Sequence, residues 1–215
     1  MIVSPRSLPD QAFEIVRERI LSAQLPPLQP IRQDALAAEL GISKIPLREA
    51  LTRLEQQGLL RSAPNRGFFV PALDAQEAEE IFELRLQLEP AAAARACALA
   101  NPTQRAAVLA AHDALARTSD GAQAQVVGAH RQFHLSLIAC DSHRITMRLI
   151  ERLHALADRY VWIHLQPQGR GRRARLEHRA LLEAWLAGDA GAVHAKLAKH
   201  LSTTLEDLRS QLRKS

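Results

Sequence analysis

The sequence predicts a mostly α-helical fold: an N-terminal winged helix-turn-helix domain at residues 1–73 and an all-helical bundle of about six helices at residues 74–215. Leucine and alanine dominate the composition and aromatic residues make up only 4% of it, which favours helices over strands. Two short helical patterns between Leu36 and Leu60 are separated by a single glycine, as in a helix-turn-helix. After residue 74 almost every segment has helical periodicity.

Composition limits the classes of protein to consider. The 215 residues suit one large domain or two modest ones. The net charge of +5 is compatible with a polyanionic partner. It is spread evenly, however, with nine Lys and Arg against seven Asp and Glu up to residue 73 and nineteen against sixteen afterwards. Any contact with DNA must therefore come from geometry, since neither part is a basic tail.

The two cysteines lie in apolar helical patterns and predict no disulfide framework. No apolar run approaches the roughly 18 residues of a membrane span. The N-terminus also lacks the pattern of a signal peptide. We therefore expect a cytoplasmic protein that does not associate with a membrane.

The first domain is expected to begin with an amphipathic helix in "PDQAFEIVRERILSAQL", which "PPLQP" ends. At its other end, "LLRSAPNRGFFVP" contains two short apolar strands joined by a Pro-Asn-Arg-Gly turn, and this pattern predicts a hairpin. The apolar positions of the first helix are Phe13, Ile15, Val16, Ile20 and Leu21.

Between these elements lies the stretch "LAAELGISKIPLREALTRLEQQGLL". Gly41 supplies the tight turn, where φ can be positive. Ser43 is expected to N-cap the second helix, and Pro46 is acceptable in its first turn. The apolar stripe that should face the core is formed by Leu47, Leu51 and Leu54.

The opposite face of the same helix carries Lys44, Ile45, Arg48 and Thr52, clustered towards its N-terminal end. Recognition helices present their N-terminal residues to base edges, and Arg or Lys suits guanine. Arg66 at the hairpin tip could reach a phosphate or the minor groove. A merely solvated face is the alternative for the basic residues alone, but glycine turn, serine cap, basic face and basic tip together predict DNA binding.

The second domain is expected to contain helices at about 75–99, 103–117, up to 139, up to 165, and two final helices parted by "AGDAG". Pro90 is expected to be tolerated within the first of them, as a kink or break. The segment "QPQGRGR" is interpreted as a loop, and the arginines of "GRGRRAR" as a solvated basic loop that could touch the DNA backbone.

All nine histidines lie in this second domain. His130 and His134, in "HRQFH", are four residues apart on a helix, about 6 Å between β-carbons, a spacing that lets two imidazoles share a metal. His178 and His200 lie beside apolar residues on later helices, and a bundle interior can hold a metal between such groups. Satisfied core histidines are the other interpretation; the remaining five are treated as surface or packing residues.

The stretch "ELGISKIPLREALTRLEQQGLL" resembles the DNA-binding pattern of the GntR regulators. The resemblance implies that its helix and the wing tip contact DNA or shape the contact. Gln24 and Leu28 depart from the pattern, which commonly has glycines there, so we expect changed local turns. The residues predicted to bind DNA are Ser43, Lys44, Ile45, Pro46, Arg48, Thr52, Asn65, Arg66 and Gly67.

The segments "ELRLQLEPAAAARACA", "HRQFHLSLIAC", "EHRALLEAWLAGD" and "KLAKHL" resemble, in order, the C-terminal domain of the FCD branch of the GntR regulators. That resemblance implies six or seven helices that hold a divalent metal through one aspartate and three histidines, with a small carboxylate effector beside it. His134, His178 and His200 match the histidines, and His130 stands where the aspartate usually is. A four-histidine site should favour zinc or nickel and attract an anion strongly.

By the same resemblance Arg85 would bind the effector carboxylate; a salt bridge to Glu89 is the alternative. The expected function is a DNA-binding regulator, a repressor by the habit of the family, that binds a palindromic operator as a homodimer and responds to a small organic acid. A metal-dependent hydrolase is the rival, although no carboxylate stands beside His130 or His134 as in HExxH enzymes. A DNA-binding protein without an effector is the third possibility.

Overall fold

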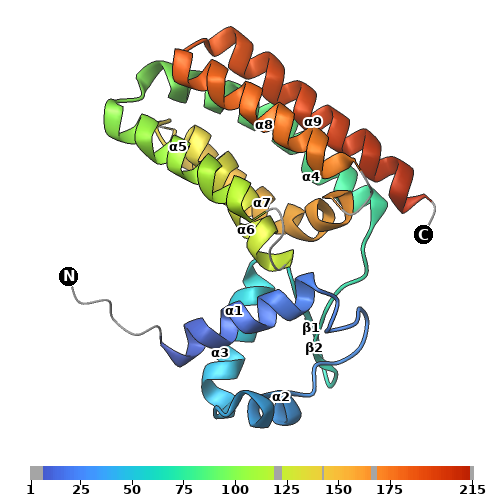
Figure 1. The fold of residues 1–215 in the computed structure, drawn as a ribbon. Coiled ribbons are helices and arrows are strands. Elements are labelled where there is room, and N and C mark those ends of the chain that lie inside the picture. Colours follow the sequence, from blue (N-terminus) through green and yellow to red (C-terminus); the bar gives the residue numbers. More distant parts are fainter. Residues whose placement is uncertain (1–6, 119–122, 142, 166–168, 214–215) are drawn as a thin grey trace. The chain divides into compact units, whose positions relative to one another are not determined.

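The computed structural model describes residues 7–118, 123–141, 143–165 and 169–213. Contacts divide the chain into two compact units, Met1–Ala72 and Leu73–Ser215. In Figure 1 the first unit runs from blue to cyan-green and the second from green to red. The first unit consists of α1 (Leu8–Leu21), α2 (Gln33–Leu40), α3 (Lys44–Gln56), β1 (Arg61–Ala63) and β2 (Gly67–Phe69).

The core of the first unit forms where α1 packs against α3. Val16 of α1 and the predicted stripe on α3 are completely buried. Burial of such side chains contributes about 1.5–3 kcal/mol each. Ile15, one of the predicted apolar positions of α1, is 39% exposed and lies outside this core. The stripe on α3 consists of Leu47, Leu51 and Leu54, as predicted.

Two backbone positions shape the turns of the first unit. Gly41 ends α2 with φ of 65°, so the predicted glycine turn is confirmed. Leu28 also has φ of 65°, which is rare for a residue with a β-carbon. Leu28 thus adopts the left-handed conformation that glycine favours, and the expected change of the local turns stays a prediction.

The predicted hairpin is also present. β1 and β2 pair antiparallel, with Arg61 opposite Phe69 and Ala63 opposite Gly67. Asn65 at the tip has φ of 60°, and asparagine tolerates this left-handed region better than most residues. A winged helix-turn-helix thus follows directly from the local sequence.

The second unit is a bundle of long helices (Figure 1). α4 passes through Pro90, as expected for a helix over about 75–99 that tolerates this residue: the proline removes one backbone donor, but the helix continues past it without a break. The helices are α4 (Ala75–Leu99), α5 (Pro102–Arg117), α6 (Gln123–Ile138), α7 (Arg144–Leu165), α8 (Arg170–Ala187) and α9 (Ala190–Leu212).

The basic segment before His178 is helical, where the sequence predicted a loop. α8 begins at Arg170, because Gly169 takes the left-handed conformation with φ of 86° and the helix propagates from the next residue. The arginines predicted to lie in a loop therefore lie on the first turns of α8. Gln166 to Gln168, the start of the predicted loop, lie outside the described residues.

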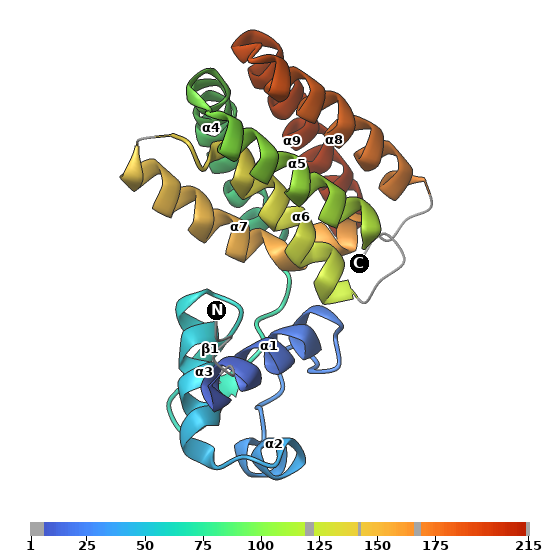
Figure 2. The ribbon, with the colours of Figure 1, turned by 60° about the vertical axis from the view of Figure 1, so that its left-hand side comes forward.

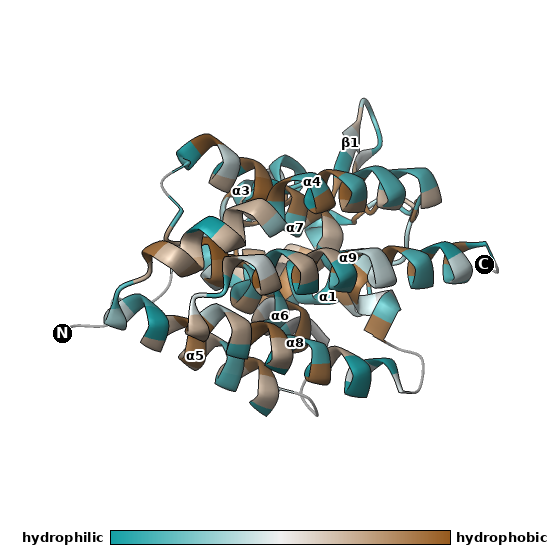
Figure 3. Ribbon diagram, turned by 90° about the horizontal axis from the view of Figure 1, so that it is seen from above, coloured by the Kyte–Doolittle hydropathy of each residue, from teal (hydrophilic) through white to brown (hydrophobic). Residues whose placement is uncertain are grey.

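Within the bundle, α4 packs along α9 and α7, and α5 packs against α6 and α8 (Figure 2). Apolar positions alternate with polar ones along each helix (Figure 3). Phe82, Phe133 and Trp185 are completely buried in the core, and the Trp185 indole donates a 2.9 Å hydrogen bond to the Leu137 carbonyl. Among the described residues, no helix is both long enough and apolar enough to cross a membrane.

Candidate DNA-reading helix and histidine centre

The outer face of α3 carries the side chains that the sequence singled out. Lys44, Arg48 and Thr52 are exposed, and Ile45 is 80% exposed. A large apolar side chain that stands free at the start of a basic helix is suited to contact a thymine methyl or a sugar. Pro46 is only partly buried and fixes the backbone of the first turn.

Ser43 occupies the N-cap position of α3, but its side chain makes no capping hydrogen bond. The predicted cap is wrong in this respect. A serine cap accepts from the second or third amide of the helix; the third residue, Pro46, has no N–H, which leaves only the amide of Ile45. The exposed Ser43 hydroxyl thus remains available for another partner.

Lys44 and the hairpin tip complete the set of residues predicted to bind DNA. The Lys44 ammonium forms an exposed ion pair with Asp34 of α2, a contact of small value that a phosphate could replace. At the hairpin tip, Asn65 and Arg66 are exposed and Gly67 is partly buried. The residues predicted to bind DNA therefore lie on two exposed features of the first unit, α3 and the hairpin.

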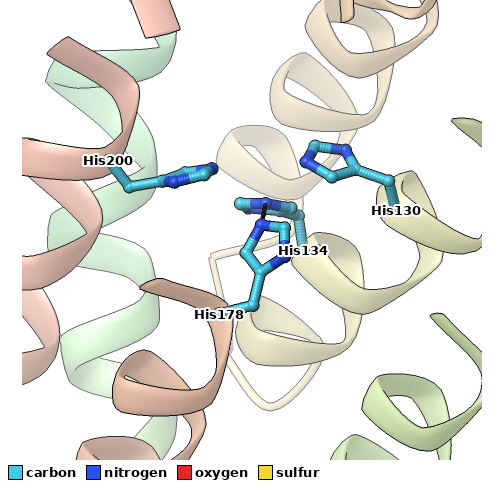
Figure 4. A group of neighbouring side chains, drawn as sticks. All are labelled: His130, His134, His178 and His200. Atoms are coloured by element: carbon cyan, nitrogen blue, oxygen red, sulfur yellow. Dashed lines mark hydrogen bonds between the residues drawn. The ribbon is translucent and has the colours of Figure 1, made fainter. Parts of the chain in front are cut away.

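In the second unit, the four predicted histidines come together. His130 and His134 extend from α6, His178 from α8 and His200 from α9, and their rings face one another (Figure 4). One nitrogen of each ring lies within 4.8 Å of the others, and all four side chains are buried. No other group of this kind is present in the part of the chain that the structure describes.

The spacing of these rings tests whether a metal would fit. The Nε2 atoms of His134 and His178 are 3.3 Å apart, about the separation of two ligands on a tetrahedral zinc with bonds of about 2.0–2.1 Å. His134 Nδ1 is buried without a hydrogen-bond partner in the described structure, and such an orphan needs an explanation. The donor set of four imidazoles fits zinc or nickel.

Burial keeps three of these rings neutral. Burial, followed by repulsion from the neighbouring histidines, holds the pKa of His130 and His134 well below the usual value, and the same holds for His178. Only the neutral imidazole binds a metal. These three rings are therefore in the correct protonation state for metal binding at neutral pH.

Sequence reasoning missed Glu177. Its carboxylate lies 2.7 Å from His200 Nδ1 and 3.5 Å from the Arg173 guanidinium. A carboxylate in this position fixes the tautomer of a metal-binding imidazole and leaves its Nε2 free for the ion. The available signal was the position of Glu177 next to His178 in the sequence, but only the fold brings it to His200.

Arg85 forms the salt bridge with Glu89 that the sequence left open as an alternative to effector binding. Its Nε lies 2.5 Å from Glu89 Oε1, and both side chains are fully buried. His154, treated as a packing residue, completes this group with Nε2 at 3.2 Å from Glu89. Burial alone would raise the pKa of Glu89, but Arg85 and His154 lower it to about 2, so a stable ion pair stands beside the cluster.

A cavity of about 10 Å³ lies between Arg85, His130 and His200. That volume suits a single water-sized occupant. A carboxylate effector would have to displace side chains to bind Arg85 there.

Two family models match the chain: "Bacterial regulatory proteins, gntR family" over residues 8–70 and "FCD domain" over residues 80–203. The chain belongs to the GntR family. It is a transcriptional regulator of the FCD branch, and regulators of this family bind DNA operators.

Its relatives agree with this assignment. The Nta operon transcriptional regulator of Aminobacter aminovorans is 29% identical over 85% of this chain and 88% of that protein. The HTH-type transcriptional repressor GlaR of Escherichia coli is 27% identical over 90% and 92%. The solved structure of E. coli McbR/YncC covers 97% of this chain and 100% of its own, with 25% identity and a TM-score of 0.78. These proteins are regulators and not enzymes, which sets the hydrolase aside.

Proposed function

We propose that this GntR regulator is a one-component repressor. In this proposal α3 and the hairpin tip read a palindromic operator, the four histidines hold zinc or nickel, and a small organic acid releases the DNA. The exposed basic face of α3 carries the first part of the proposal, and the buried histidine cluster carries the second.

DNA reading is supported by the separation of the two faces of α3. Leu47, Leu51 and Leu54 hold the helix in place with one face, while Lys44 and Arg48 stand on the other. A guanidinium on the first two turns of such a helix can make a bidentate contact with guanine, worth about 1–3 kcal/mol against a wrong base. A single helix reads few base pairs, which supports a homodimer on two half-sites.

The exchange Arg48→Ala tests this part. A duplex selected from a random library by the wild-type protein should lose about 10- to 100-fold in affinity, because the base contact is worth about 1–3 kcal/mol, and its footprint should disappear. Gln56→Ala, at the exposed end of the same helix, is the matched control and should bind normally. An unchanged footprint of Arg48→Ala would remove α3 from the proposed DNA contact.

The metal is supported by the four buried imidazoles and by the Glu177 carboxylate beside His200. Imidazole nitrogens suit zinc, nickel and copper more than magnesium or calcium. Four neutral ligands would leave the full 2+ charge of the ion uncompensated when it is bound, and this charge would attract a carboxylate.

Repression is supported by the relative GlaR of Escherichia coli, which is a transcriptional repressor. A ligand can shift operator binding only through different affinities for the bound and released arrangements. A dimer is also supported by two exposed apolar residues one turn apart on α7, Ile145 and Leu149, which are 69% and 52% exposed. Operator affinity indifferent to metal and organic acids would favour a regulator without an effector.

A further inference from the structure

A second cavity is lined by residues of α5 and α8 and touches the histidine cluster at His178. Its volume is about 260 Å³, just under the range of typical small-molecule pockets, about 300–1,000 Å³, and far larger than the cavity beside Arg85. The residues that line it include His112, Leu115, Arg175, Leu176, His178 and Arg179.

The pocket carries two arginines without a counter-charge. Arg175 and Arg179 are exposed, one helical turn apart on α8, and neither forms an ion pair with any residue in the described ranges. Arg173 on the same helix, by contrast, forms an ion pair with Asp207. Two uncompensated guanidinium groups at the mouth of a pocket attract an anion and can bind a carboxylate in a bidentate way.

The rest of the lining is suited to an apolar body. Leu115 of α5 is partly buried, and Leu176 is 62% exposed although it lies between the two arginines in the sequence. An exposed leucine in a pocket can be covered by the apolar part of a ligand. His112 adds a buried Nδ1 without a hydrogen-bond partner in the described structure, since the Asp113 carboxylate is 3.8 Å away, beyond bonding distance.

His178 connects this pocket to the histidine cluster. It is one of the residues that line the pocket, while its Nε2 lies 3.3 Å from His134 Nε2 inside the cluster. A molecule in the pocket would therefore press against the same ring that faces the proposed metal. No protein carboxylate is recorded on His178, in contrast to His200 with Glu177, among the described residues.

We infer that the pocket between α5 and α8 binds a small organic anion, with its carboxylate on Arg175 and Arg179 and its apolar body over Leu115 and Leu176. The inference rests on the proposed function in one respect: this anion is taken to be the effector. The effector would then act on the metal centre from outside, through His178, and the central cavity beside Arg85 would not need to open.

Titration calorimetry on the full-length protein tests the inference, with acetate, benzoate, hexanoate and inorganic phosphate as probes. Benzoate or hexanoate should bind saturably at concentrations of about 1 mM or below, a modest affinity, and more tightly than acetate or phosphate. Arg175→Gln and Arg179→Gln should each weaken binding at least about tenfold, since hydrogen bonds between charged groups are strong. Arg172→Gln, an exposed arginine of α8 outside the pocket, should bind as the wild type does.

Operator release by the same probes separates this inference from the proposed function. If Arg175→Gln and Arg179→Gln lose the probe but wild-type protein holds its operator regardless, the pocket stands and the effector role fails. If the probe still binds and releases both variants, the effector site is elsewhere and the inference is wrong. Tighter binding of phosphate than of benzoate, or no saturable binding of any probe, would also overturn it.

Discussion

In the first unit the predicted functional side chains point outwards from one helix and one hairpin, whereas in the second they point inwards from α6, α8 and α9. The first arrangement needs only local structure, because a glycine turn and an apolar stripe determine which side of α3 is free. The second needs the whole bundle to bring four rings within 4.8 Å. The difference in histidine content follows the same division, since all nine histidines lie in the second unit.

Acid should cause the largest difference in stability between the two units. The pKa values of His130, His134, His154 and His178 in the folded chain are lowered by burial, and that of His164 falls to about 4. The unfolded chain, with pKa values near 6.5, then binds more protons, so stability rises with pH and is lost as pH falls below about 6.5. Each histidine contributes up to about 1.4 kcal/mol per pH unit in that window.

The measurement is unfolding of chelator-treated protein between pH 7 and pH 5. Tryptophan fluorescence reports the second unit alone, because Trp162 and Trp185 both lie there. We expect that transition to weaken by several kcal/mol, while the first unit, followed by operator binding or calorimetry, changes little. Equal stability of the second unit at both pH values would contradict buried neutral histidines.

Removal of one ring should have the next largest effect. His134→Ala deletes a central member of the cluster, and we expect zinc or nickel affinity to fall by more than the roughly 10–100-fold that an outer-shell partner contributes. His194→Ala, an exposed histidine of α9, is the matched control and should retain full metal content. Both variants should still bind nonspecific duplex through α3, because the exchanged histidines lie in the second unit and α3 lies in the first.

Much of the first unit could be predicted from the sequence. Gly41, the three leucines of α3 and the Pro-Asn-Arg-Gly hairpin are local signals, and each is confirmed. The capping bond of Ser43 is absent although Ser43 occupies the N-cap position, and Pro46 removes one of the two amides that could have donated it. The lesson is that a capping residue has to be judged together with the amides it would bind.

The second unit could be predicted only in part. Helical periodicity gave the bundle, but the spacing of His130 and His134 alone could not connect them to His178 and His200; the family resemblance supplied that link. Glu177 could not be predicted, because its contact with His200 depends on how α8 packs against α9. Likewise, nothing local distinguishes His154, which meets Glu89 across two helices.

Ser43→Ala should have a smaller effect, on binding rather than folding. Because its side chain makes no capping bond, the exchange should cost the first unit less than the about 1 kcal/mol typical of a lost N-cap. Operator affinity should fall up to about tenfold if the hydroxyl contacts DNA, since a neutral hydrogen bond contributes about 1 kcal/mol. Thermal unfolding and operator titration check the two halves; a loss of stability with normal affinity would reverse the assignment.

Leu28→Gly should have the smallest effect. The leucine is 65% exposed and holds φ at 65°, a conformation that costs a residue with a β-carbon about 1–2 kcal/mol. Glycine removes that strain but makes the unfolded chain more flexible, so we expect a gain of up to about 1 kcal/mol. Denaturant unfolding of the first unit measures it, and a clear loss of stability would mean that Leu28 packs more than its exposure indicates.

We propose two separate sites: a DNA-reading face on the surface of the first unit and a histidine centre inside the second. The most direct test measures the zinc or nickel content per chain of three purified proteins. We predict that the wild type and Arg48→Ala carry the same amount of metal, although only the wild type binds the operator. His134→Ala should carry far less metal. Equal metal in all three proteins would contradict the histidine centre, and loss of metal from Arg48→Ala would contradict the separation.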